Sequence, residues 1–186
     1  YDSILNRDKK ELHRKIAEII ESKYEKELEN HYDILYMHFS RAGIRKKAME
    51  FCYKAALKHK NDYNPGISLE YYNKFLELAG DASEPETAAK VVCAYKDIGY
   101  INALTANYDH ALEYLEKALD AVQVSDEKYS IKIAIAGIYK DKCKYDKALE
   151  ILNEIEPKIK QDNSLFGKFL QMKCDILRIT GDPEAL

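Results

Sequence analysis

One pattern decides the fold, and it reads Tyr108-Asp109-His110-Ala111-Leu112-Glu113-Tyr114-Leu115. It returns 37 residues later as Tyr145-Asp146-Lys147-Ala148-Leu149-Glu150-Ile151-Leu152. A weaker third copy in the first half of the chain reads Lys47-Ala48-Met49-Glu50-Phe51-Cys52-Tyr53-Lys54-Ala55. Recurrence at about 20 to 50 residues is typical of stacked supersecondary units, so the sequence predicts a repeat array.

The rest of the chain also has helical patterning. Apolar residues recur at spacings of three and four almost everywhere, and no stretch shows sustained alternation. Glycine and proline are scarce, at 7 and 4 of 186 residues, whereas a sheet protein needs many tight turns. These features predict an all-α protein, an α-α superhelix of about nine helices. No linker is long enough to separate independent domains, so residues 1–186 are expected to form one domain.

The repeated segments resemble the tetratricopeptide family, whose unit of about 34 residues has small side chains where two antiparallel helices cross. The matching residues of the best copy are Tyr95, Ile98, Gly99, Tyr108, Ala111, Leu115 and Ala118. Those of the following copies are Ile135, Ala136, Tyr139, Tyr145, Ala148, Leu152, Cys174 and Leu177. Two positions depart from the family pattern, because Asn102 replaces a tyrosine and Lys132 replaces a large apolar residue. The copies are clearer over residues 81–186 than over residues 1–80, where the helical pairs are degenerate.

A wider resemblance concerns the first half of the chain. Its residues are Glu11-Leu12-His13-Arg14-Lys15-Ile16-Ala17-Glu18, then His31-Tyr32, then Phe39-Ser40-Arg41-Ala42-Gly43. They are similar to the helical region downstream of the NTPase module in bacterial signalling proteins with adenylate/guanylate cyclase or kinase modules. The resemblance implies a cytoplasmic parent whose NTPase and cyclase chemistry lies outside these residues. The chain opens at Tyr1 without a methionine and stops at Leu186, so we expect a segment of a longer protein. The alternative is the peptide-sensing repeat domain of a transcription regulator.

Composition argues against several classes of function. The net charge is -3, with 29 basic and 32 acidic residues, whereas a nucleic-acid binder usually has a basic excess. The four cysteines form no C-x-x-C pair and fall in predicted helices, which indicates reduced thiols in the cytoplasm and no zinc site. No apolar run reaches about 18 residues, so no membrane span is predicted.

Catalytic motifs are also missing from the sequence. Neither G-x-x-x-x-G-K-[ST] nor G-x-G-x-x-G occurs, although a nucleotide site needs such a loop to direct backbone amides at phosphates. The five histidines do not have the H-E-x-x-H spacing of a zinc hydrolase. We therefore expect no enzymatic activity, no cofactor and no metal site in this chain.

The resemblance does suggest where a protein or peptide would bind. In tetratricopeptide arrays the first helix of each pair lines a concave face, and this geometry nominates Lys96, Tyr100, Lys140, Gln171 and Arg178. Three cations and two hydrogen-bonding side chains would suit an extended peptide with acidic groups, because charge-assisted contacts are strong. The alternative is that these residues are ordinary solvated side chains and the array acts only as a spacer or a dimerisation surface.

Overall fold

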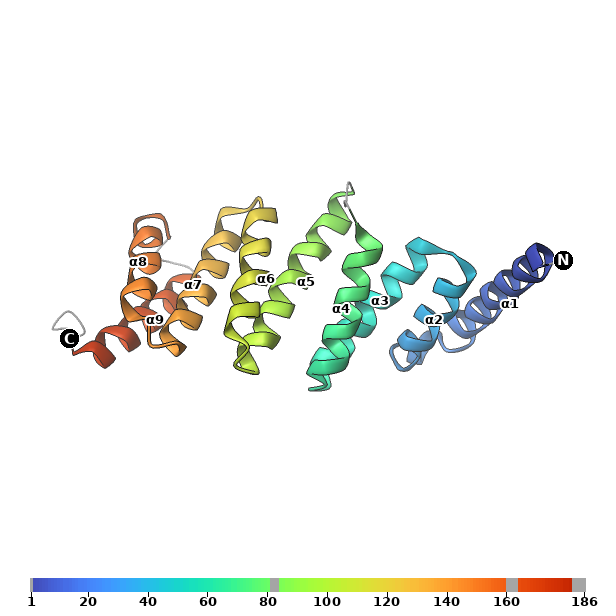
Figure 1. Cartoon of the computed structure of the whole chain (residues 1–186), viewed down its shortest axis with the longest axis horizontal. Coiled ribbons are helices and arrows are strands. Elements are labelled where there is room, and N and C mark those ends of the chain that lie inside the picture. The colour runs from blue at the N-terminus through green and yellow to red at the C-terminus, as the bar shows by residue number, and fades with distance from the viewer. Residues whose placement is uncertain (1, 81–83, 160–163, 182–186) are drawn as a thin grey trace. The chain divides into compact units, whose positions relative to one another are not determined.

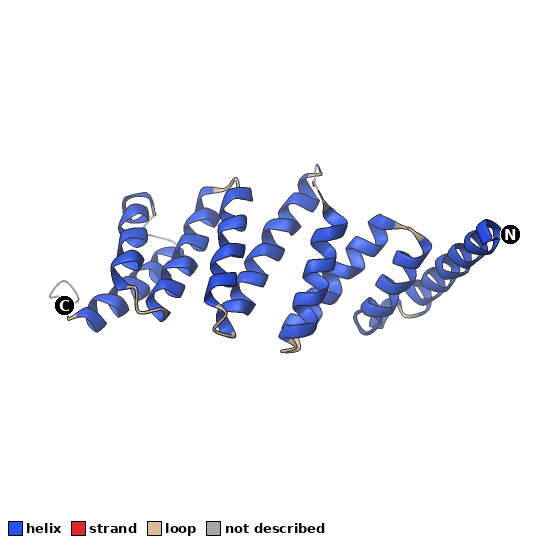
Figure 2. Cartoon of the chain, in the orientation of Figure 1, coloured by secondary structure: helices blue, strands red, loops and turns tan. Residues whose placement is uncertain are grey.

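The computed structural model describes residues 2–80, 84–159 and 164–181. Helices dominate it (Figures 1 and 2). The α-helices are α1 (Asp2–Lys23), α2 (Tyr32–Ala42), α3 (Arg45–Asn61), α4 (Pro65–Ala79), α5 (Pro85–Leu104), α6 (Tyr108–Ala121), α7 (Ser125–Asp141), α8 (Tyr145–Ile155) and α9 (Ser164–Thr180). Two 3₁₀-helices, η1 (Glu25–His31) and η2 (Glu156–Lys158), follow α1 and α8. Within the described ranges there are nine α-helices and no strand, which confirms the predicted all-α class.

The chain divides into two compact units, residues 1–90 and residues 91–186. In the first unit, α1 packs on α2, α2 on α3, and α3 on α4. In the second unit, α6 packs on α7 and α7 on α8, while α9 contacts both α7 and α8. Within each unit, these helices thus pack on their neighbours in sequence, as hairpins require. The expectation that residues 1–186 form a single domain stays a prediction.

Four helix ends share one turn geometry. A residue with positive φ closes the helix, and the amide of the next residue donates to the carbonyl five positions earlier, at 2.8 to 3.0 Å. The residues with positive φ are Gly43, Tyr63, Ala106 and Cys143, at 75°, 57°, 58° and 55°. This left-handed closure satisfies carbonyl groups that the last helical turn leaves free. The same left-handed turn therefore precedes α3, α4, α6 and α8.

Five residues after each of these positive-φ residues, the chain places a small and buried side chain. The four residues are Ala48, Ser68, Ala111 and Ala148, none of which is more than 1% exposed. At one of these crossings, a Cβ added to Gly99 of α5 would lie 2.7 Å from Cγ of Leu115 and 3.3 Å from the carbonyl oxygen of Ala111. The backbones of α5 and α6 approach this closely only because Gly99 and Ala111 are small.

Ser68 marks a copy of the repeat that sequence analysis missed. The segment Ser68-Leu69-Glu70-Tyr71 occupies in α4 the position that Ala111-Leu112-Glu113-Tyr114 occupies in α6. The serine hydroxyl is fully buried and donates to the carbonyl oxygen of Ala56 at 2.9 Å. Because this bond satisfies the hydroxyl, serine can replace alanine at a close crossing of α3 and α4.

Replacing Tyr63 with glycine should stabilise the first unit by up to about 1 kcal/mol. A left-handed backbone conformation costs an ordinary L-residue roughly 1–2 kcal/mol in the folded state. Glycine avoids this strain, but it loses more conformational entropy on folding, which cancels about half of the gain. Tyr63 is 92% exposed, so truncation removes little packing. Chemical denaturation followed by circular dichroism measures the change. Tyr63→Ala is the control, because it removes the ring and keeps the strained backbone. Equal stability of the two variants would contradict the prediction.

Candidate functional site

The five nominated residues lie on the first helices of the second unit. Lys96 and Tyr100 are on α5, Lys140 is on α7, and Gln171 and Arg178 are on α9. Side-chain contacts join α5 to α7, and a Cβ added to Gly137 of α7 would lie 3.1 Å from Met172 of α9. The three first helices are therefore lateral neighbours. We call the surface carrying the five nominated residues the first-helix face.

Lys96 is tied to the next repeat by an ion pair. Its Nζ donates to Oε1 of Glu127, at the start of α7, at 2.8 Å. Burial works against the lysine charge, but the hydrogen bond and the charge of Glu127 outweigh it and raise the pKa of Lys96 above its usual value. Lys96 is thus a firmly protonated cation with a carboxylate already beside it. Sequence analysis missed Glu127, although it lies about one repeat after Lys96 and so on a neighbouring first helix.

Tyr100 makes a second link between α5 and α7. Its hydroxyl group interacts with the side chain of Ser130, one turn along α7 from the partner of Lys96. Burial raises the pKa of Tyr100, so the phenol is neutral at physiological pH and remains a hydrogen-bond donor. Its side chain still reaches the surface, with 37% of the residue exposed. Lys96 is therefore positioned by its ion pair, and Tyr100 by its partial burial.

The structure does not join the other three nominated residues to Lys96 or Tyr100, and each has its own surroundings. Lys140 lies 4.0 Å from the carboxylate of Asp141, its neighbour in sequence. Arg178 is largely exposed and lies 3.3 Å from Asp175 on its own helix. Gln171 is exposed on the same helix. Each cation thus has a carboxylate near it, and the first-helix face carries alternating charge rather than the excess of positive charge that the nominated residues suggested.

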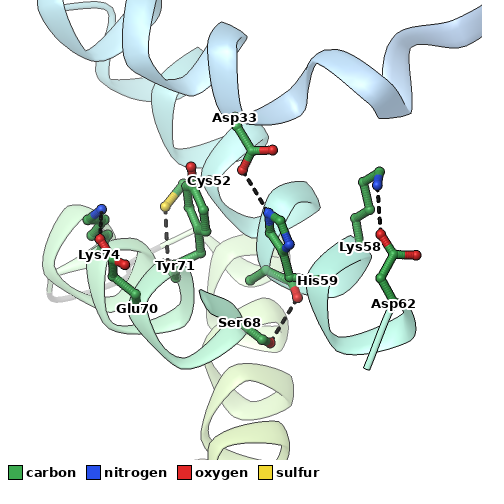
Figure 3. A network of polar contacts seen from close by, with 10 residues as sticks. Asp33, Cys52, Lys58, His59, Asp62, Ser68, Glu70, Tyr71 and Lys74 are labelled. Atoms are coloured by element: carbon green, nitrogen blue, oxygen red, sulfur yellow. Dashed lines mark hydrogen bonds and ion pairs between the residues drawn. The ribbon is translucent and has the colours of Figure 1, made fainter. Parts of the chain in front are cut away.

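A separate polar network joins three helices of the first unit (Figure 3). Nε2 of His59 on α3 lies 2.9 Å from Oδ1 of Asp33 on α2. Burial, followed by the influence of the Asp33 carboxylate, raises the pKa of Tyr71 on α4. The rings of His59 and Tyr71 stack, with centroids 5.6 Å apart and an angle of 8°. The Asp33 carboxylate thus links α2 to α3, and the stacked rings of His59 and Tyr71 extend this contact to α4.

A shallow, mostly apolar hollow of about 430 Å³ lies beside this network, between α2 and α4. Its walls include Tyr36, Met37 and Tyr71, and Lys74 lies over both tyrosine rings at 5.8 and 5.1 Å. Lys74 is also paired with Glu70 at 2.5 Å. The hollow is therefore filled in part by a cation of the protein itself, which stacks on its walls.

Reactive chemistry is not evident in the described part of the chain. Burial raises the pKa of the Cys52 thiol to about 12, and its Sγ donates to the carbonyl of Tyr71 at 3.2 Å, so it is a poor nucleophile. Within residues 2–80, 84–159 and 164–181, no three His, Cys, Asp or Glu side chains gather as metal ligands would. In the same ranges, no helix combines the length and apolar character that crossing a bilayer requires.

Comparison with known proteins identifies the fold. No family model and no curated protein matches the chain. A solved structure of a putative kinesin light chain from Podosopora anserina, with nearly identical TPR-like repeats, is similar with a TM-score of 0.66 at 10% identity. The alignment covers 96% of this chain and 88% of that one. BtubC (BKLC) from P. vanneervenii is similar with a TM-score of 0.62 at 12% identity, covering 97% and 86% of the two chains. The predicted tetratricopeptide-like fold is thereby confirmed, and at these identities the likeness establishes the fold alone.

Proposed function

We propose that the chain is a non-catalytic interaction scaffold whose first-helix face binds an extended peptide or protein segment. The observation that carries the proposal is the link between repeats, in which Lys96 of α5 is paired with Glu127 of α7 and Tyr100 lies beside Ser130. Two polar side chains fixed by a neighbouring repeat lose little entropy when a ligand binds. Stacked helical pairs present such side chains at regular intervals along a surface, which suits an extended ligand.

The ligand that fits best is a peptide with acidic groups. An incoming carboxylate would replace Glu127 beside Lys96, or Asp141 beside Lys140, and keep a charge-assisted bond. Each exchange is close to balanced, because one carboxylate replaces another. Affinity then depends on how many cations a single peptide engages at once, so an extended acidic segment is preferred over a free amino acid.

The parent protein is proposed to be a bacterial cytoplasmic signalling protein with an upstream NTPase module, of the class in which some members also carry a cyclase module. This proposal is supported by the resemblance of residues 11–18 and 39–43 to the helical region of such proteins. A peptide-sensing transcription regulator is the alternative, and a DNA-binding module directly upstream in the open reading frame would favour it. In both cases the residues described here would recognise a polypeptide and leave catalysis or DNA binding to another module.

Reversing the charges of Lys96 and Lys140 should weaken binding of acidic peptides at least about tenfold, because hydrogen bonds to charged groups contribute roughly 1.5–3 kcal/mol each. Peptides are first selected on the wild-type chain from a random displayed library, and their affinity for Lys96→Glu with Lys140→Glu is then measured by fluorescence anisotropy. Glu127→Gln should have the opposite effect and strengthen binding, because it removes the competing carboxylate from Lys96.

The matched control reverses two lysines on the second helices, Lys117 of α6 and Lys147 of α8. It changes the net charge equally and leaves the first-helix face intact, so affinity should stay within about twofold of wild type at physiological salt. Circular dichroism checks that each variant is folded. If the Lys96 and Lys140 variant is folded and binds the selected peptides like the wild type, the first-helix face is not the binding surface.

A further inference from the structure

Two histidines meet across the first helical hairpin. The Nδ1 atoms of His13 on α1 and His38 on α2 lie 2.8 Å apart, and the ring centroids lie 5.0 Å apart at an angle of 50°. Both residues are half-buried. Two nitrogens at this distance share a hydrogen bond, in which one Nδ1 carries the proton and the other offers its lone pair. The contact therefore exists only while at least one of the two imidazoles is neutral.

The surroundings of this pair disfavour positive charge. Arg41, one turn after His38 on α2, adds a cation, and burial followed by the charges of His13 and Arg41 lowers the pKa of His38 below its usual value. The other residues one turn away on either helix are basic or apolar, namely Lys9, Lys10, Ile16, Ala17, Ile34, Leu35 and Ala42. A second proton on the pair thus has no carboxylate at these positions to stabilise it.

The carboxylates of α1 near His13 are already engaged. Arg14 forms ion pairs with Glu11 at 2.8 Å and with Glu18 at 3.4 Å. Both acids are exposed. Their charges are thus largely compensated on the outer side of α1, away from α2, and screened by solvent. Protonation of both imidazoles would place two N–H groups and two positive charges against each other.

The remaining attachment of α1 is modest. Among the described residues, α1 packs mainly on α2 and η1, and Lys47 of α3 pairs with Glu21 at 2.5 Å. Over residues 5–23 of α1, Ala17 is the one fully buried apolar residue, whereas Leu12 and Ile19 are 58% and 62% exposed. Segments with few buried apolar contacts open at lower free energy than the core of a domain. A change at the histidine pair therefore acts on a helix with little buried apolar surface.

We propose that the His13–His38 pair is a pH-sensitive latch, which holds α1 on α2 when at least one imidazole is neutral and releases α1 when both are protonated. The direction follows from proton binding. The docked state binds fewer protons than the released state, in which a histidine titrates near about 6.5. Docking is therefore fully favoured above this value. It weakens up to roughly tenfold per pH unit below it, until His38 becomes protonated in the docked state as well.

Hydrogen exchange of the full 186-residue chain, read by mass spectrometry, tests the latch. Exchange in α1 is compared with exchange in α7, which contains no histidine, so that the intrinsic effect of pH on amide chemistry cancels. Between about pH 7.5 and about pH 5.5, on either side of the usual histidine pKa, the protection of α1 relative to α7 should fall several-fold in the wild type.

The His13→Gln and His38→Gln variants should lose this pH dependence, because glutamine keeps hydrogen-bonding capacity but does not titrate in this range. His110→Gln is the matched control, since His110 is an exposed residue of α6 in the second unit and its loss should leave the fall in α1 protection unchanged. The two latch variants are measured separately, so a folding failure of one leaves the other to decide. A constant ratio of α1 to α7 protection in the wild type, or a fall that persists in both glutamine variants, would overturn the proposal.

Discussion

Replacing Phe51 with alanine should lower the free energy of unfolding of the first unit by about 3–5 kcal/mol, the usual loss for a buried phenylalanine. The side chain has no exposed surface. Its ring stacks on Phe39 of α2, with centroids 5.5 Å apart and an angle of 6°, and lies 6.0 Å from the ring of Tyr32. Truncation therefore leaves a cavity between α2 and α3 whose walls are rigid aromatic rings, which collapse poorly.

Two lysines that contact the Phe51 ring increase the expected loss of stability. The ammonium groups of Lys47 and Lys54 lie 5.6 and 5.1 Å from the centre of the Phe51 ring. Each is also paired with a carboxylate, Glu21 at 2.5 Å and Glu50 at 2.7 Å. Partly exposed contacts between a cation and a ring contribute about 0.5–1 kcal/mol each, so alanine at position 51 removes these together with the packing.

Chemical denaturation followed by far-ultraviolet circular dichroism measures the loss, because the chain has no tryptophan to serve as a fluorescent probe. Tyr63→Ala is the control, since it truncates an exposed aromatic residue of the same unit and should change stability by no more than about 0.5 kcal/mol. If Phe51→Ala is as stable as that control, Phe51 is not central to the core of the first unit.

Replacing Ala111 with leucine should destabilise the second unit by about 1–3 kcal/mol through overpacking. Ala111 is fully buried where α6 crosses α5, and its carbonyl oxygen is among the atoms nearest to a Cβ added at Gly99. Leu115, which is also fully buried, occupies the space on the other side. The added side chain has no free volume to enter, so the helices must separate. Ala148→Leu should have the same effect at the equivalent position of α8, which is equally buried.

Ala121→Leu on α6 is the matched control, because Ala121 is exposed at the end of the same helix. Thermal unfolding should show its midpoint close to that of the wild type, whereas both crossing variants should melt clearly earlier. Wild-type midpoints for Ala111→Leu and Ala148→Leu would mean that the register of the helical crossings is wrong.

Local sequence determined the helices and most of the crossings. The repeated Tyr108–Leu115 and Tyr145–Leu152 segments predicted Ala111 and Ala148 as crossing residues, and both are fully buried. The reason is that a helical repeat encodes its own small and large positions at fixed spacing, whatever the neighbouring repeats contain. The pattern did not reveal Ser68, because a serine is usually a surface or capping residue. It becomes a crossing residue only when the Ala56 carbonyl accepts its hydroxyl proton.

Tertiary structure decided the partners of the surface residues. Apolar residues recur at helical spacing in α1, but that spacing does not encode whether a neighbouring helix covers them, and Leu12 and Ile19 are exposed. The sequence likewise nominated Lys96 as a cation for an acidic peptide, and the fold pairs it with Glu127, 31 residues away. The contact between His13 and His38 is likewise a result of tertiary packing, because 25 residues separate the two histidines in the chain. Helical spacing fixes which residues share a face, and only the packing of whole helices determines which charges and protons lie opposite one another.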